Sequence, residues 1–292
     1  MQKLSGLLNL NKSAGITSRD VVDAALRMVR PAKAGHAGTL DPLATGVLVV
    51  CVGPATRLIR YVQEMPKHYT GTFLLGRSSP TEDIEGELTE LLDPPVPSRE
   101  HVEEAAAALT GEILQRPPAF SAKKVQGERA YALARRGKTV RLKPHQVTVY
   151  RLEITRYEYP ELVLDIDCSS GTYVRSLGRD LAERLGTAAV MSTLVRTAIG
   201  PYRLADALQT DDLNRENVTE RLLPPLSAVP GLPQVELDSD ALRAIKLGKA
   251  IPRPLDLPEA NQYACVDPHG RLAAILVPRG PGRLGPALNL DV

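Results

Sequence analysis

The feature that most constrains the fold is the irregular order of the strand-like and helix-like segments. Two segments that alternate apolar and polar residues, Val147–Arg156 and Leu162–Asp167, follow each other with no helix between them. A helical segment, Arg175–Leu185, comes only afterwards. Because strands and helices do not alternate regularly, the order argues against a repeated βαβ fold. It predicts an α+β fold with a central mixed or antiparallel sheet flanked by helices.

The remaining segments complete this prediction. Further strands are expected at Ser5–Leu10, Val47–Val52, Lys67–Gly76 and Ala188–Ala198. Further helices are expected after the capping residues Thr17 and Ser18, at Thr56–Met65 and at Ser98–Leu109. A proline-rich stretch over 222–234 precedes a helix at Asp240–Leu247 and two short strands, Gln262–Asp267 and Arg271–Val277. The chain of 292 residues is therefore predicted to form a large domain over 1–230 and a small β-rich domain over 231–292.

Composition excludes several classes of protein. The longest strongly apolar run, Val47–Val52, is far shorter than the ~20 residues that cross a bilayer. The first residues lack the apolar core of a signal peptide, so the sequence predicts a cytoplasmic protein with no membrane partner. The cysteines, Cys51, Cys168 and Cys265, lie far apart with no CxxC spacing, which favours small buried residues over a disulfide framework or a zinc cluster.

The charges are distributed unevenly along the chain. Residues 81–112 carry one Lys or Arg against ten Asp or Glu, whereas residues 113–143 carry nine against one. The basic stretch falls in a long proline-rich loop over about 116–144, and loops of this length are uncommon unless they are functional. Charge alone leaves two readings equally open, namely a solvated face and a surface that binds phosphates.

One short motif, GHAGTLDPLATGVL at Gly35–Leu48, combines a histidine, three glycines and a single carboxylate, Asp41. Read alone, Asp41 followed by Pro42 fits an ordinary structural residue, either a helix N-cap with proline at the first helical position or a turn residue. The chain has no GxSxG, P-loop or GxGxxG sequence, and its five histidines have no metal-ligand spacing. Any chemistry must then come from carboxylate, tyrosine and arginine side chains, with no cofactor and no metal expected.

Six segments together resemble the TruB family of pseudouridine synthases, in the family's order. They are the motif at 35–48, the NKSAGITS segment at 11–18, the strand that begins Lys67-His68-Tyr69, the loop over 117–137, CSSGTYVRSL at 168–177 and Leu194–Thr197. One departure is Ser13, where the family usually has proline. The C-terminal part resembles the family's small PUA-like domain more loosely.

The resemblance implies that the chain isomerises uridine 55 in the T-loop of tRNA to pseudouridine. It assigns catalysis to Asp41, Tyr69 and Arg175. Asp41 would be the carboxylate near C1′ or C6 of the uridine, Arg175 would keep it ionised, and Tyr69 would stack on the uracil and help to remove the C5 proton. Without the resemblance, Arg175 would be read as a surface helix residue and Tyr69 as a half-buried strand residue.

The same resemblance implies a set of residues that bind substrate or RNA. His36 would fill the space left by a flipped-out uridine, and Lys12 would order the catalytic loop or contact a phosphate. Their ordinary alternatives are a loop histidine bonded to the turn backbone and a solvent-exposed lysine. The loop over about 116–144 would act as a thumb that clamps the T-arm backbone. The full set adds these residues: Thr39, Leu194, Tyr173, Lys123, Lys124 and Arg129.

Two other functions stay open at this point. The chain could be the catalytic subunit of an RNA-guided particle, although the long thumb loop argues against a guide RNA. It could also be an RNA-folding protein in which catalysis is secondary, although the presence of Asp41, Tyr69 and Arg175 argues against lost catalysis. The leading prediction is a stand-alone enzyme that acts as a monomer on the tRNA T-arm.

Overall fold

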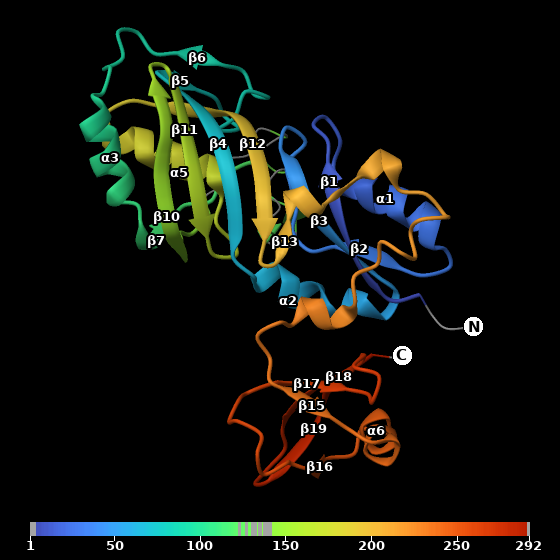
Figure 1. Cartoon of the computed structure of the whole chain (residues 1–292). Coiled ribbons are helices and arrows are strands. Elements are labelled where there is room, and N and C mark those ends of the chain that lie inside the picture. The colour runs from blue at the N-terminus through green and yellow to red at the C-terminus, as the bar shows by residue number, and fades with distance from the viewer. Residues whose placement is uncertain are drawn as a thin grey trace. The chain divides into compact units, whose positions relative to one another are not determined.

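The computed structural model describes residues 4–121, 124–125, 128–129, 133, 136 and 142–290 (Figure 1). Its internal contacts divide the chain into two compact units. The first unit comprises Met1–Asp41, Val47–Gln63 and Pro201–Val292, and the second comprises Pro42–Gly46 and Glu64–Gly200. Among the described residues, no helix is both long and apolar enough to cross a membrane.

The first unit begins with a small sheet and one amphipathic helix. Strand β1 lies between β14 and β3 in this sheet, and β2 pairs with β3. Helix α1 begins at Ser18 because Thr17 and Asp20 form a reciprocal capping box, and its Val21, Val22, Ala25 and Val29 pack into the core. The elements are β1 (Gly6–Lys12), α1 (Ser18–Val29), β2 (Ala34–His36), β3 (Thr45–Val52), η1 (Gly53–Leu58), α2 (Ile59–Glu64), β13 (Tyr202–Arg203), η2 (Leu204–Asp206), β14 (Leu208–Gln209), η3 (Thr210–Asp212) and η4 (Pro225–Ala228).

The second unit is built on a larger sheet. From the first residues of β3 the strands run in the order β3, β12, β4, β11, β10 and β7. The β3–β12 pair is parallel and the other pairs are antiparallel, so the sheet is mixed. Its elements are β4 (Lys67–Leu75), β5 (Arg77–Ser78), β6 (Thr89–Glu90), α3 (Arg99–Ala107), β7 (Gly111–Gln115), β8 (Lys124–Val125), β9 (Glu128–Arg129), β10 (His145–Glu158), β11 (Glu161–Cys168), α5 (Val174–Arg184) and β12 (Ala189–Ile199).

Strand β4 shows why this sheet can hold a site. Burial alternates along it, and Lys67, Tyr69, Phe73 and Leu75 lie on its buried face. Helix α5 packs on β12 and β4, while α3 packs on β10 (Figure 1). Gly178 allows α5 to approach closely, because a Cβ atom there would lie 2.1 Å from the Phe73 ring. The buried face of β4 therefore carries polar residues within an otherwise apolar packing surface.

The C-terminal residues of the first unit form a sheet of their own. Its strand order is β15, β17, β18, β19 and β16, and α6 packs against β19 and β16. The elements are β15 (Gln234–Glu236), α6 (Ser239–Lys246), β16 (Ile251–Pro252), β17 (Tyr263–Val266), β18 (Leu272–Pro278) and β19 (Arg283–Asn289). The predicted α+β class, with a mixed sheet, helices and a separate β-rich C-terminal part, is confirmed.

Most predicted elements are present, and the exceptions are informative. Strands β7 and β19 were not predicted. Each contains a residue that weakens the strand pattern, since β7 begins with Gly111 in a left-handed conformation and β19 contains Pro286. The cysteines are buried and unpaired, as predicted. Burial raises the pKa of the Cys51 and Cys265 thiols to about 12 and that of Cys168 to about 11.

Candidate active site

Asp41 lies in the connection between β2 and β3, where the chain forms bends and no helix. The helix N-cap alternative for Asp41 therefore does not hold, whereas the turn alternative agrees with the bends of this connection. Aspartate followed by proline suits a turn as well as a helix start, and here β3 begins only three residues after Pro42. Asp41 as a residue is partly exposed.

The backbone just before Asp41 is fixed by a buried serine. The Ser18 hydroxyl accepts a hydrogen bond from the Leu40 amide at 2.8 Å and donates one to the Leu40 carbonyl at 3.0 Å. Ser18 was expected to help cap α1, but Thr17 does so. Ser18 is thus free of the capping role and instead holds the residue next to Asp41.

The backbone after Asp41 is fixed within the second unit. Thr45 and Gly46 pair with Val195 and Arg196 at the start of β3. Gly46 has φ of +100°, and a Cβ atom there would lie 2.3 Å from the Arg196 carbonyl oxygen. Glycine is therefore required at position 46 for the chain to pass so close to β12.

Lys12 is fully buried at the end of β1, so the alternative of a solvent-exposed lysine is wrong. Its ammonium donates to the carbonyls of Ser13 at 2.9 Å and Ile16 at 2.7 Å. These two bonds close the turn that precedes α1. They give it a fixed shape although Ser13 replaces the family's usual proline.

Tyr69 lies on the buried face of β4 next to two cations. Arg196 is its partner in the β4–β12 pairing, and the Arg196 Cζ atom lies 6.0 Å from the centre of the Tyr69 ring. Lys67, two residues earlier on the same face, donates from Nζ to the Met65 carbonyl at 2.6 Å. Burial, and then the charge of Arg196, lower the pKa of Lys67 to about 8. The alternative of a half-buried strand tyrosine is also wrong, because Tyr69 is buried.

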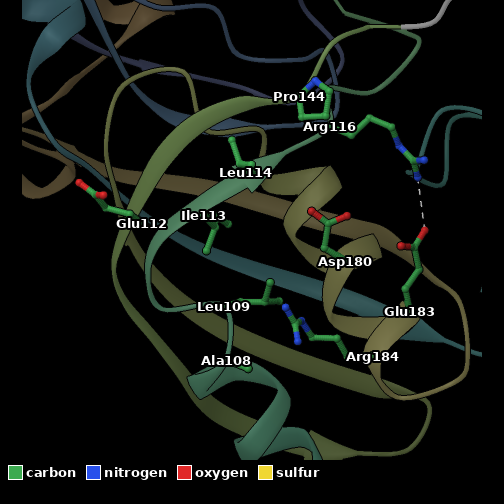
Figure 2. A pocket seen from close by; sticks show the side chains of 10 residues that line it. All are labelled: Ala108, Leu109, Glu112, Ile113, Leu114, Arg116, Pro144, Asp180, Glu183 and Arg184. Atoms are coloured by element: carbon green, nitrogen blue, oxygen red, sulfur yellow. Dashed lines mark hydrogen bonds and ion pairs between the residues drawn. The ribbon is translucent and has the colours of Figure 1, made fainter.

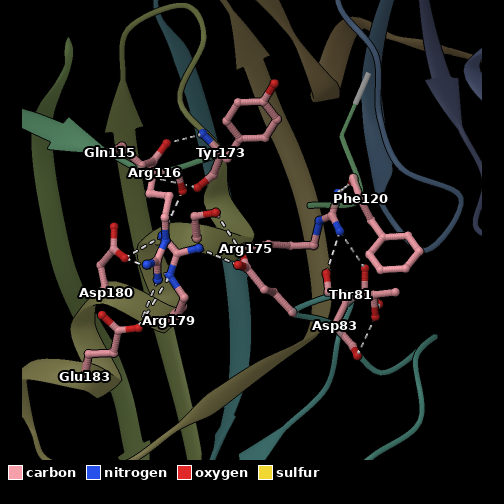
Figure 3. A network of polar contacts seen from close by, with 12 residues as sticks. Thr81, Asp83, Gln115, Arg116, Phe120, Tyr173, Arg175, Arg179, Asp180 and Glu183 are labelled. Atoms are coloured by element: carbon pink, nitrogen blue, oxygen red, sulfur yellow. Dashed lines mark hydrogen bonds and ion pairs between the residues drawn. The ribbon is translucent and has the colours of Figure 1, made fainter. Parts of the chain in front are cut away.

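Arg175 is buried near the start of α5 and lies in a polar network (Figure 3). Its guanidinium donates to the carbonyls of Thr81 at 2.6 Å and Phe120 at 3.0 Å. One of its nitrogens lies 3.3 Å from the carboxylate of Asp83. The alternative of a surface helix arginine is therefore wrong.

Asp83 is a buried residue that sequence reasoning missed. Its carboxylate accepts from the Thr81 hydroxyl at 2.6 Å and from the Glu85 amide at 3.1 Å, in addition to facing Arg175. The preceding residue, Glu82, has a left-handed φ of +63° and bonds to Ser176 and Arg179 of α5. Asp83 belongs to the acidic stretch over 81–112, and nothing in the sequence of that stretch indicates that this one carboxylate is buried.

Tyr173 is the residue that precedes α5, and its backbone is held by a buried side chain. The Gln115 amide group accepts from the Tyr173 amide at 2.8 Å and donates to the Tyr173 carbonyl at 3.0 Å (Figure 3). The edge of the Tyr173 ring meets His145, with ring centres 6.1 Å apart. Gln115, like Asp83, was not singled out from the sequence.

The other predicted binding residues lie in different surroundings. His36 is the partly buried last residue of β2, Thr39 is exposed in the loop before Asp41, and Leu194 is buried in β12. Lys124 and Arg129 are partners in the short β8–β9 pairing. Lys123 lies outside the described residues.

A surface pocket of about 680 Å³ in the second unit contains none of these residues (Figure 2). It is lined by the end of α3, β7 and the last turn of α5, and an Arg116–Glu183 ion pair of 3.5 Å lies at one side. Within the described residues, no group of three or more His, Cys, Asp or Glu side chains could hold a metal ion. The three predicted catalytic residues are therefore described separately, Asp41 in the first unit, and Tyr69 and Arg175 with their buried neighbours in the second.

Comparison with known proteins gives consistent results. The description "TruB family pseudouridylate synthase (N terminal domain)" matches residues 26–174. The chain is 43% identical to a tRNA pseudouridine synthase B of Arthrobacter sp. (strain FB24), over 95% of this chain and 94% of that protein. It is 38% identical to a protein of the same name from Caldanaerobacter subterraneus subsp. tengcongensis, over 95% of this chain and 96% of that protein.

Solved structures share the fold at lower identity. A Cbf5–Nop10–Gar1 complex contains a chain with a TM-score of 0.74 and 24% identity, covering 99% of this chain and 84% of that one. An H/ACA RNP bound to a substrate RNA with 2′-deoxyuridine gives a TM-score of 0.72 and 23% identity, covering 98% and 84%. With the family description matching residues 26–174 and relatives aligned over nearly its full length, this chain belongs to the TruB family of pseudouridine synthases.

Proposed function

We propose that this chain isomerises uridine 55 in the T-loop of tRNA to pseudouridine, with Asp41 as the catalytic carboxylate. Relatives at up to 43% identity that align over nearly the whole chain are named tRNA pseudouridine synthase B, which supports tRNA as the substrate. The observation that carries the proposal is the loop of Asp41. Asp41, a partly exposed residue, follows a residue fixed by Ser18 and precedes a segment fixed on β12.

The reaction needs no net gain or loss of atoms. The N1–C1′ bond of uridine breaks, the uracil turns, and C5 bonds to C1′. The C5 proton leaves and N1 gains a proton. Asp41 attacks C1′ or supports elimination toward a glycal-like intermediate, as carboxylates do in glycoside cleavage.

Tyr69 and Arg175 support this step in different ways. Tyr69 stacks on the uracil and helps to remove the C5 proton. Arg175 keeps Asp41 ionised, because a nearby positive charge favours the charged form of a carboxylate. The fixed guanidinium of Arg175, bonded to two carbonyls and facing Asp83, suits a residue that must supply charge without moving.

The remaining predicted residues would bind the RNA. The target uridine must leave the loop stack, at a cost of a few kcal/mol, before Asp41 can reach it. His36 would occupy the vacated space, with Thr39, Tyr173 and Leu194 shaping the pocket and Lys12 ordering the turn beside α1. Lys123, Lys124 and Arg129 of the thumb would clamp the T-arm backbone without reading sequence. The domain over 1–230 would carry catalysis and the PUA-like domain over 231–292 would add RNA contacts.

The decisive experiment is incubation of the purified protein with an unmodified T-arm stem-loop, in EDTA and with no guide RNA, followed by mapping of pseudouridine. We expect modification at position 55 alone. Asp41→Asn should lose at least about 10³-fold in single-turnover rate, since no other group replaces the carboxylate, while its Kd for the stem-loop changes less than about threefold.

Three outcomes would contradict the proposal. They are turnover by Asp41→Asn at the normal rate, modification at another position, and a requirement for a guide RNA or a second protein. Neutralising the three thumb cations together should weaken RNA binding and reduce the slope of log K against log salt. We also propose that the enzyme acts in the cytoplasm as a monomer, and sedimentation at working concentration tests the oligomeric state.

A further inference from the structure

Arg196 is a fully enclosed cation for which the proposed mechanism gives no role. Only 1% of its surface is exposed. Taking an ionised group out of water is costly unless nearby groups compensate, so a buried guanidinium calls for a reason. Its immediate neighbours on the sheet supply that reason.

The sheet places Arg196 directly beside Tyr69. The two residues are partners in the antiparallel β4–β12 pairing, and the pairing is irregular immediately after Arg196, before Ala198 meets His68. An irregularity of this kind re-aims the side chains next to it. The Arg196 Cζ atom lies 6.0 Å from the Tyr69 ring centre, which is within range of a cation–π interaction, and Tyr69 itself is only 9% exposed.

The backbone of Arg196 is held from the other side as well. Gly46 is its partner in β3, and the two backbones are so close that even a methyl group at position 46 would clash with Arg196. The backbone of Arg196 is therefore fixed, which limits the positions that its guanidinium can take. This is the arrangement needed for a side chain that fixes the plane of a neighbouring ring.

The charge of Arg196 acts on the groups on this face of β4. After burial, it is the second cause that lowers the pKa of Lys67 to about 8. Arginine keeps its charge at any working pH. A permanent positive charge beside a tyrosine stabilises negative charge as it develops on the phenol oxygen.

We propose that Arg196 is a positioning residue for Tyr69. It holds the ring in the plane needed for stacking and supplies a permanent positive charge while the C5 proton is removed. This inference rests on the proposed function, because it assumes that Tyr69 takes part in that proton transfer.

A double-mutant cycle on the purified full chain tests the inference. The rates compared are single-turnover rates on the T-arm stem-loop for wild type, Arg196→Gln, Tyr69→Phe and the double variant. Arg196→Gln should lower the rate roughly 10- to 100-fold, with its Kd for RNA changed less than about threefold. In the Tyr69→Phe background the same substitution should lower the rate by a factor at least about fivefold smaller, since the phenol oxygen is gone and only the effect of Arg196 on the plane of the ring remains. If Arg196→Gln lowers the single-turnover rate by the same factor in both backgrounds, the inference is overturned.

Two additions keep the test decisive if a variant is unstable or too slow. Arg196→Lys keeps a cation and should recover at least half of the lost rate on a logarithmic scale. A substrate deuterated at C5 of the target uridine should show a larger isotope effect with Arg196→Lys than with wild type. No recovery together with an unchanged isotope effect would also overturn the inference.

The chain offers a matched control. Arg253 lies over the Tyr263 ring in the C-terminal sheet at the same 6.0 Å distance, and Arg253→Gln should change the single-turnover rate less than about twofold. A comparable loss in this variant would mean that removal of any such pair disturbs the enzyme. If wild type makes no pseudouridine, the proposed function itself fails. An active wild type with an additive cycle overturns only the role of Arg196.

Discussion

The sheet of the second unit and the C-terminal sheet each place an arginine over a tyrosine at 6.0 Å, yet the two pairs have different surroundings. Arg253 keeps 27% of its side chain exposed, lies 3.8 Å from Glu259 and donates to the Leu257 carbonyl. The Tyr263 hydroxyl is bonded to two backbone groups of the nearby loop. This pair serves to hold a loop, whereas Arg196 and Tyr69 are buried within the sheet.

The same difference extends to other buried charges. Among the described residues, the second unit buries four charged side chains, Lys67, Asp83, Arg175 and Arg196, whereas the C-terminal sheet and its turns bury only Asp267. Asp267 serves local structure, because it accepts from the amides of His269 and Arg271 in one turn. Buried charge generally costs stability unless it is compensated. The buried charge of the second unit lies in the same unit as the candidate residues Tyr69 and Arg175.

Among the variants that test this comparison, Gly46→Ala should lower the free energy of unfolding the most. It adds a methyl group 2.3 Å from the Arg196 carbonyl at φ of +100°, so we expect a loss of about 3 kcal/mol or more in the free energy of unfolding. Gly248→Ala is the matched control in the C-terminal part, since its φ is +78° but nothing lies within 4 Å, and it should cost about 1 kcal/mol. Urea denaturation measures both. Equal costs would show that strain alone, and not contact with β12, requires glycine at position 46.

Asp83→Asn should come next. The change removes the negative charge 3.3 Å from Arg175 while keeping the shape of the side chain. Loss of one partner of a buried pair predicts a cost of about 3 kcal/mol in unfolding free energy, together with a slower single turnover. Asp93→Asn, on the exposed part of the same acidic stretch, should change stability less than about 0.5 kcal/mol. If Asp83→Asn changes neither the unfolding free energy nor the single-turnover rate, this buried charge is not part of the candidate site.

Lys67→Met should change how stability depends on pH. The pKa of Lys67 is about 8 in the folded chain, below the 10.5 of an ordinary lysine. Between these values the unfolded chain binds the extra proton, so this lysine makes stability rise with pH, by on the order of 3 kcal/mol in total. The difference between wild-type and variant unfolding free energies, measured from pH 7 to 10, should therefore move in favour of wild type. If the difference in unfolding free energy does not change with pH, burial does not lower the pKa of Lys67.

Arg253→Gln should have the smallest effect. Its cation–π contact is partly exposed, and such contacts contribute about 0.5–1 kcal/mol. Thermal unfolding should show a correspondingly small shift. A loss as large as that of Asp83→Asn would break the comparison, because the C-terminal pair would then be as critical as the buried charges of the second unit.

Sequence reasoning predicted the elements whose pattern is local. The alternation along β4 and the apolar spacing of α1 and α5 predicted these elements to within about two residues. At Asp41 the local pattern Asp-Pro fits both a helix start and a turn, so the sequence left both alternatives open. Ser18 and Arg196, both distant in sequence, decide between them by binding Leu40 and by pairing with Gly46.

The candidate site residues also fall into two groups, those predicted from the sequence and those found only in the structure. Asp41, Tyr69 and Arg175 were identified because they occur in short motifs in a characteristic order, and motif and order are properties of the sequence alone. Asp83 and Gln115 became visible only through burial and partners, and Arg196, although it lies in the family-like segment Leu194–Thr197, was given a role only once its burial beside Tyr69 was known. Their neighbours come from strands and helices far along the chain, so local periodicity holds no trace of them. The sequence by itself determined the family, most of the longer elements and the residues proposed as catalytic. Tertiary structure decided which charges are buried and which side chains they hold, because burial is set by strand order and by packing between distant segments.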